Sequence, residues 1–172
     1  SEASDIFGVV QEQYNGFGEN HFYEALFSEV KPPLEYNAVE DESIEDNNGY
    51  ARGTVIEDGD RLLARIDSNL DRDWFQLTVP PGLSSLTIEI EAFMFGSPLD
   101  PILYLYPPDP EDEDDYLRVR NNADPNNLDP ILTYTLDGGE EGLTYNLLVK
   151  SFAGTGSEFS WYVMDVSVDS TN

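Results

Sequence analysis

Residues 65–79 form a stretch with the sequence RIDSNLDRDWFQLTV, which joins a polar turn to an alternating segment. In its second half every second residue is apolar, namely Phe75, Leu77 and Val79. Successive side chains of a strand point to opposite faces, so this period predicts a half-buried β-strand with these three residues facing a core. The opposite face would carry Trp74, Gln76 and Thr78.

The first half of this stretch is rich in side chains that can bind a cation through oxygen. They are Asp67, Asn69, Asp71 and Asp73. A turn that leads into a strand holds several such oxygens close together, and hard cations such as calcium favour that arrangement. The alternative is a polar β-turn that binds no ion.

An acidic and amide-rich run, ESIEDNNGYARG at residues 42–53, lies upstream of the turn. Most runs of like charge are solvated linkers or surface segments. The other interpretation is that this run folds back onto the turn and supplies Glu42, Glu45, Asn47 and Asn48 to the same cation.

Together the two stretches resemble the bacterial pre-peptidase C-terminal domain family. That family has a Glu-x-Glu-Pro-Asn-Asp run and, after a strand, an Asp-x-Asp pair followed by aromatic residues. Here EDNN at 45–48 and DRDWF at 71–75 stand in those places, and residues 96–106, 143–149 and 160–168 resemble its later strands. The resemblance covers residues 39–168. Ser43 and Asn48 depart from it, which removes formal charge from the site.

The resemblance implies a jelly-roll-like antiparallel β-sandwich with a calcium site. The implied ligands are Glu42, Glu45, Asn47, Asn48, Asp71 and Asp73. It also implies an accessory module of a secreted or cell-surface protein. Such a module would help a parent hydrolase to meet a polymeric substrate, a polysaccharide or a protein, or would assist secretion and maturation.

The remaining pattern is also that of an all-β domain. Short apolar or alternating segments are separated by turn residues from about residue 50 onward, which is typical of an antiparallel sandwich. The motif LDPIL occurs at 99–103 and again at 128–132, and each copy is expected to start a strand. We therefore predict an N-terminal extension over residues 1–38 and the sandwich over residues 39–172.

The extension has two apolar segments of ambiguous period. Ser4 and Asn20 are candidate caps of two short helices, the second ending before Pro32. A strand through residues 6–10 is the competing prediction. The segment is apolar enough that we expect it to pack on the sandwich or on a neighbouring domain.

The charge of the chain disfavours two kinds of partner. The chain has 35 acidic and 8 basic residues, for a net charge of −27, so binding to nucleic acid or to an anionic membrane surface is disfavoured. Bound calcium and a salty medium are joint explanations of how such a chain stays compact. No apolar run is long enough to form a transmembrane segment, and cysteine is absent.

The sequence contains few of the groups that nucleophilic catalysis requires. His21 is the sole histidine, so we predict a binding module and not an enzyme; a carboxylate-pair glycosidase is a remote alternative. Trp74 and Trp161 are candidate ligand-binding rings for a polymer, whereas Tyr104 and Tyr106 are expected in the core. A structural or adhesive surface protein that binds another protein is the second functional hypothesis. We expect a monomer.

Overall fold

The computed structural model describes residues 8–12, 23–27, 36–39, 49, 52–108, 115–119, 128–136 and 142–170, the first two ranges by their backbone alone. The chain divides into two compact units, Ser1–Lys31 and Pro32–Asn172. The predicted boundary between residues 38 and 39 falls inside a strand of the second unit, β3 (Ala38–Val39), which pairs with β5 (Arg61–Arg65).

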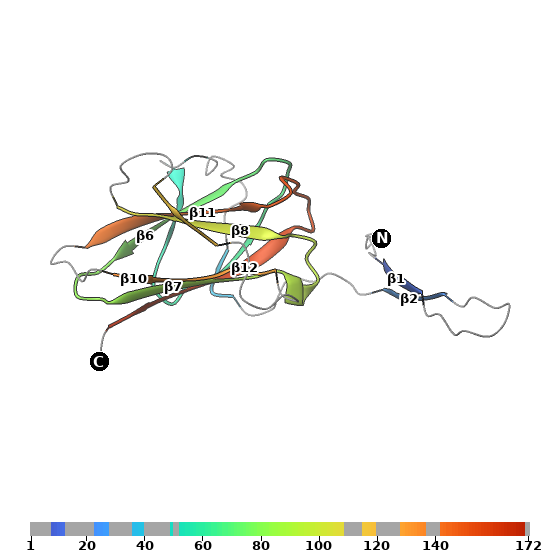
Figure 1. The fold of residues 1–172 in the computed structure, drawn as a ribbon, viewed down its shortest axis with the longest axis horizontal. Helices are drawn as coiled ribbons and strands as arrows, with labels where there is room; N and C mark the ends of the chain where they lie inside the picture. The colour runs from blue at the N-terminus through green and yellow to red at the C-terminus, as the bar shows by residue number, and fades with distance from the viewer. Residues whose placement is uncertain are drawn as a thin grey trace. The chain divides into compact units, whose positions relative to one another are not determined.

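The first unit contains a β-hairpin. Strand β1 (Gly8–Glu12) pairs antiparallel with β2 (Tyr23–Phe27), with Val10 opposite Ala25 (Figure 1). The prediction of two helices is therefore wrong for these residues, and the competing strand at 6–10 overlaps β1. Apolar segments of about five residues fit both periods, and β-branched and aromatic side chains favour the strand.

The second unit is an antiparallel β-sandwich, as predicted, built from two five-stranded sheets (Figure 1). Sheet I has the order β10-β7-β12-β5-β3 and adds β7 (Ser85–Glu91), β10 (Ile131–Thr135) and β12 (Trp161–Asp169) to the two strands above. Sheet II has the order β4-β6-β11-β8-β9. Its strands are β4 (Thr54–Ile56), β6 (Asp73–Val79), β8 (Pro101–Tyr106), β9 (Leu117–Val119) and β11 (Leu143–Ser151). Among the pairs described, only β3–β5 and β4–β6 are parallel.

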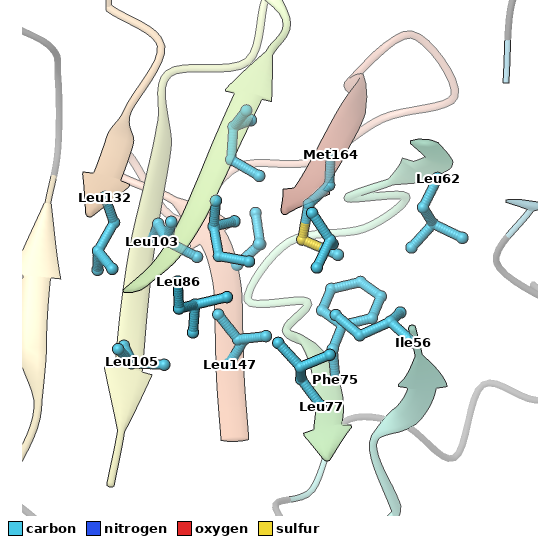
Figure 2. Packing of buried hydrophobic residues seen from close by; sticks show 14 of the residues in the cluster. Ile56, Leu62, Phe75, Leu77, Leu86, Leu103, Leu105, Leu132, Leu147 and Met164 are labelled. Carbon is cyan, nitrogen blue, oxygen red and sulfur yellow. The ribbon is translucent and has the colours of Figure 1, made fainter. Parts of the chain in front are cut away.

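The main core lies between the two sheets. Phe75, Leu103 and Leu147 of sheet II meet Leu62 and Met164 of sheet I, and all are buried (Figure 2). In β6 the apolar set predicted from the alternation is the set that faces this core. Burial of apolar surface is the dominant favourable term in folding, so this layer fixes the register of both sheets.

The two LDPIL motifs start strands in different sheets. The first leads into β8 of sheet II and the second into β10 of sheet I. The carboxylate of Asp129 in the second motif is buried and accepts the amides of Ala92 and Phe93 at 2.9 and 3.1 Å. It thereby fixes the start of the short 3-10 helix η2 (Phe93–Phe95).

Candidate functional site

The Asp-rich turn before β6 is bound along its length to the loop between β11 and β12. The amide of Leu70 donates to the carbonyl of Gly154 at 3.1 Å, and the amide of Ser157 donates to the carbonyl of Ile66 at 2.9 Å. Gly156 approaches the turn so closely that a Cβ atom there would clash with the carbonyl oxygen of Ser68. The two segments therefore form one rigid corner at the end of sheet II.

Asp71 closes the turn with its own carboxylate. Its oxygens accept the backbone amides of Asp67 at 2.9 Å and of Arg72 at 2.7 Å. Burial raises the pKa of Asp71, the two amides act against that rise, and the nearby carboxylate of Asp67 adds to it. The carboxylate of Asp67 thus lies close enough to disfavour the ionisation of Asp71.

Asp73 lies deeper, between the sheets. Its side chain is 2% exposed, and its Oδ2 accepts the hydroxyl of Tyr162 at 2.7 Å. Tyr162 belongs to β12 of sheet I, so this hydrogen bond joins the two sheets at the first residue of β6. A buried carboxylate needs such donors, because its desolvation would otherwise be very costly.

The predicted cation site is described only in part. Asp71 lies on the turn and Asp73 is the first residue of β6, while Glu42, Glu45, Asn47 and Asn48 lie outside the described residues. Among the residues that are described, no three His, Cys, Asp or Glu side chains gather closely enough to hold a metal ion. Calcium binding stays a prediction.

The two tryptophans are not exposed binding rings, contrary to the prediction. Trp74 is 8% exposed and Trp161 is 6% exposed. Trp74 does point away from the main core, but its ring lies 5.2 Å from that of Tyr106, between centroids. It belongs to a second apolar cluster on the outer face of sheet II, with Ile102, Tyr104 and Leu148. The expectation that Tyr104 is a core residue is confirmed, and Tyr106 is half-buried against this cluster.

Strand register arranges this outer cluster as a row across sheet II. Leu148 of β11 lies opposite both Trp74 of β6 and Tyr104 of β8, and Tyr104 lies opposite Arg118 of β9. Lys150 is two residues beyond Leu148 on the same face. The row therefore changes from apolar to basic toward the edge of the sheet.

Arg118 and Lys150 both lie over the ring of Tyr104. The Nζ atom of Lys150 is 4.8 Å from the ring centroid, and the Cζ atom of Arg118 is 6.0 Å from it. Both distances are those of cation–π contacts. In the part of the chain that the structure describes, neither residue forms a salt bridge with a carboxylate. By contrast, Arg61 on sheet I is held by Glu91 at 2.6 Å and by Asp165.

These residues border a hollow of about 360 Å³, which we call the basic hollow. It is lined by residues 70–72 of the turn, Ile102 and Tyr104 of β8, Arg118 of β9, and residues 150–154 at the end of β11. Arg72, Arg118 and Lys150 give it three of the eight basic residues of the chain. Its one described carboxylate is Asp71, whose oxygens are already bound to backbone amides.

The sequence prediction missed the basic hollow, although it had found the turn that forms one wall. The available signal was the scarcity of basic residues, since only Lys31 and Lys150 are lysines. No local pattern shows that residues 72, 118 and 150 converge, because that depends on the pairing of β11 with β8 and of β8 with β9.

Comparison with known proteins gives a structural likeness and no sequence match. No protein-family model and no curated protein matches the chain. The fold is similar to the pre-peptidase C-terminal domain of a collagenase from Bacillus anthracis, with a TM-score of 0.48 and 12% identity over 67% of this chain and 95% of that one. This is the domain type that the sequence resembles. Within the described ranges, no helix is long and apolar enough to cross a membrane.

Proposed function

We propose that this chain is a non-catalytic accessory module of a secreted or cell-surface protein, and that it binds a polymeric ligand at the basic hollow. The observation that carries the proposal is the hollow itself. It lies on the outer face of a rigid sheet, and its volume of about 360 Å³ falls in the range of small-ligand sites. A site of this size can take one unit of a longer polymer.

The groups that line the hollow suit binding better than catalysis. Arg72, Arg118 and Lys150 are cations, and the carboxylate of Asp71 is held by two backbone amides. General acid–base chemistry needs a group that can exchange a proton with the substrate, and nucleophilic catalysis needs a base beside the nucleophile. Among the described residues that line the hollow, Asp71 is the one carboxylate, so the lining offers no carboxylate pair of the kind that glycosidases use.

Calcium is the second part of the proposal. Burial and the nearby carboxylate of Asp67 disfavour the ionisation of Asp71, and a bound cation would favour it. The acidic run at residues 42–48 would supply the remaining oxygen ligands. Because residues 70–72 belong both to the turn and to the hollow, calcium at the turn would also fix the wall that carries Arg72.

The test combines calcium titration with polymer binding. After treatment with a chelator, the chain is titrated with calcium by calorimetry and melted at low salt with and without the ion. The expected result is heat of binding and a higher melting temperature with calcium, because a ligand that binds only the native state must stabilise it. Retention on immobilised polysaccharides and on collagen is measured in the same two conditions.

Two results would overturn the proposal separately. If chelation leaves the melting temperature unchanged, the calcium part of the proposal is wrong. If none of the immobilised polymers retains the chain, the proposed binding function is wrong.

A further inference from the structure

The described side chains that line the basic hollow carry more positive than negative charges, in a strongly acidic protein. The chain as a whole carries −27, yet the described side chains around this hollow contribute three positive charges and one carboxylate. These local charges affect which ligand binds, because they act on it at contact distance. The field of the more distant charges is screened over about 10 Å in 0.1 M salt.

The positions of Arg118 and Lys150 are set by the sheet. Arg118 lies opposite Tyr104, and Lys150 lies opposite Ile102, the neighbouring outward residue of β8. Both cations are thereby held over one aromatic ring, at 6.0 and 4.8 Å from its centroid. An anion bound beside this ring would be attracted by both positive charges.

Among the described residues, no carboxylate of the protein occupies the position beside Arg118 and Lys150 that such an anion would take. Asp71 is the one carboxylate on the described lining, and both of its oxygens accept backbone amides within the turn. Arg61 shows the opposite case in the same molecule, since Glu91 and Asp165 both bind it. Within the described residues no carboxylate forms a salt bridge with Arg118 or Lys150, so these two cations can bind an anion from outside.

We propose that the basic hollow binds the anionic group of an acidic polysaccharide, a carboxylate or a sulfate carried on a sugar unit. This inference rests on the proposed function, and it names the class of polymer. A guanidinium binds a carboxylate or sulfate through two parallel hydrogen bonds, and an ammonium adds a point charge. The apolar lining from Ile102 and Phe152 gives the body of the unit a surface to contact.

A polysaccharide fits this place better than a peptide. Extended peptides usually bind by adding a strand to the open edge of a sheet, and helical peptides need a long apolar groove. The hollow instead lies mainly over β8 and the end of β11, which are interior strands of sheet II, and takes from the edge strand β9 the side chain of Arg118.

The experiment uses the full chain with alginate, dextran sulfate and unmodified dextran as probes, at about 150 mM salt and about 1 mM calcium. Alginate carries carboxylates, dextran sulfate carries sulfates, and dextran is neutral. Affinity is measured by gel retardation or calorimetry for the wild type and for Arg118→Gln and Lys150→Gln. Arg52→Gln is the matched control, because it removes an equal charge from an exposed residue that does not line the hollow.

The expected result is binding to at least one acidic polymer and none to dextran. Arg118→Gln and Lys150→Gln should each weaken it on the order of tenfold, the usual effect of one charge-assisted hydrogen bond, while Arg52→Gln leaves it unchanged. Arg118→Lys should restore part of the loss. Circular dichroism and melting curves show that each variant is folded.

The outcomes separate this inference from the proposed function. If dextran binds as tightly as the acidic polymers, or if Arg52→Gln weakens binding as much as Arg118→Gln and Lys150→Gln do, the hollow is not an anion site. Polymer binding as such would still stand. Binding that disappears with chelator yet is unaffected by Arg118→Gln and Lys150→Gln shows a calcium bridge between two acidic polymers, and also overturns it. If none of the three probes and neither collagen nor any other polysaccharide binds, the proposed function fails as well.

Discussion

Replacing Tyr162 with phenylalanine removes one hydroxyl from the middle of the sandwich and tests the bridge between the sheets. The hydroxyl donates to Asp73 at 2.7 Å, and the two side chains are 0% and 2% exposed. A hydrogen bond to a charged group contributes about 1.5–3 kcal/mol. At about 2–4 °C per kcal/mol for a chain of roughly this length, Tyr162→Phe should lower the melting temperature by about 3–12 °C.

Asp73→Ala tests the other side of the same bond and the predicted cation site. It leaves the buried hydroxyl of Tyr162 with one partner fewer, at a cost of about 1–3 kcal/mol. If Asp73 also binds calcium, this variant loses the rise in melting temperature that calcium gives. Tyr162→Phe keeps that rise, because it leaves the carboxylate in place.

The assay is calorimetric or chemical unfolding of the wild type, the two single variants and the double variant, with calcium and with chelator. Both residues make further interactions, so the double-mutant cycle is needed to isolate their coupling. The control is Asp112→Ala in the acidic run at 109–115, which should have little effect because it changes one charge among many. Zero coupling, or an Asp73→Ala variant as stable as Asp112→Ala, would refute the reasoning.

Three further outcomes are expected. Micromolar to millimolar calcium should raise the melting temperature more than the same concentration of magnesium, because a flexible site of oxygen ligands accepts the longer metal–oxygen distances of calcium. Sodium chloride at hundreds of millimolar should add a separate and smaller gain by screening. Equal effects of calcium and magnesium would contradict a calcium site. Gly156→Ala should destabilise the chain by about 1–3 kcal/mol through the clash with Ser68, whereas Gly49→Ala, which has nothing within 4 Å, should be close to neutral in urea unfolding. Glu89 lies directly opposite Asp165, and its pKa is raised by burial and by neighbouring carboxylates. The folded state therefore binds the proton of Glu89 more tightly than the unfolded state does, so the ionised carboxylate destabilises the fold at neutral pH. This destabilisation is lost as the pH falls through the raised pKa toward about 4.3, the usual pKa of a glutamate in an unfolded chain. Glu89→Gln should stabilise by about 0.2–1 kcal/mol at pH 7 and flatten the acid side of the stability curve; an unchanged curve would contradict this.

The sandwich was predictable because strict alternation is a strong local signal. Phe75, Leu77 and Val79 face the main core as their spacing requires, since a shift of one residue would turn all three to the other face. The N-terminal hairpin was harder to predict. Val9 and Val10 lie in a five-residue strand, which is too short for its apolar residues to separate the helical period from that of a strand.

The burial of Trp74 shows where alternation stops being informative. The pattern correctly assigns this ring to the outer face of β6, but an outward direction is not the same as exposure. Leu148, Tyr104 and Tyr106 come from strands far away in the sequence and cluster with the ring on that face. These residues meet because β11 pairs with both β6 and β8. The periodicity of a single strand does not contain that information.

The rare charges of this chain carry more information than the abundant ones. The chain has 35 acidic residues against 8 basic ones, and three of those eight line one hollow. Arg118 and Lys150 place their charged atoms over the ring of Tyr104, as cation–π contacts, at the border of the hollow. What the charges add is attraction for an anion, at the one described hollow where the rigid turn and the end of β11 hold three of them together.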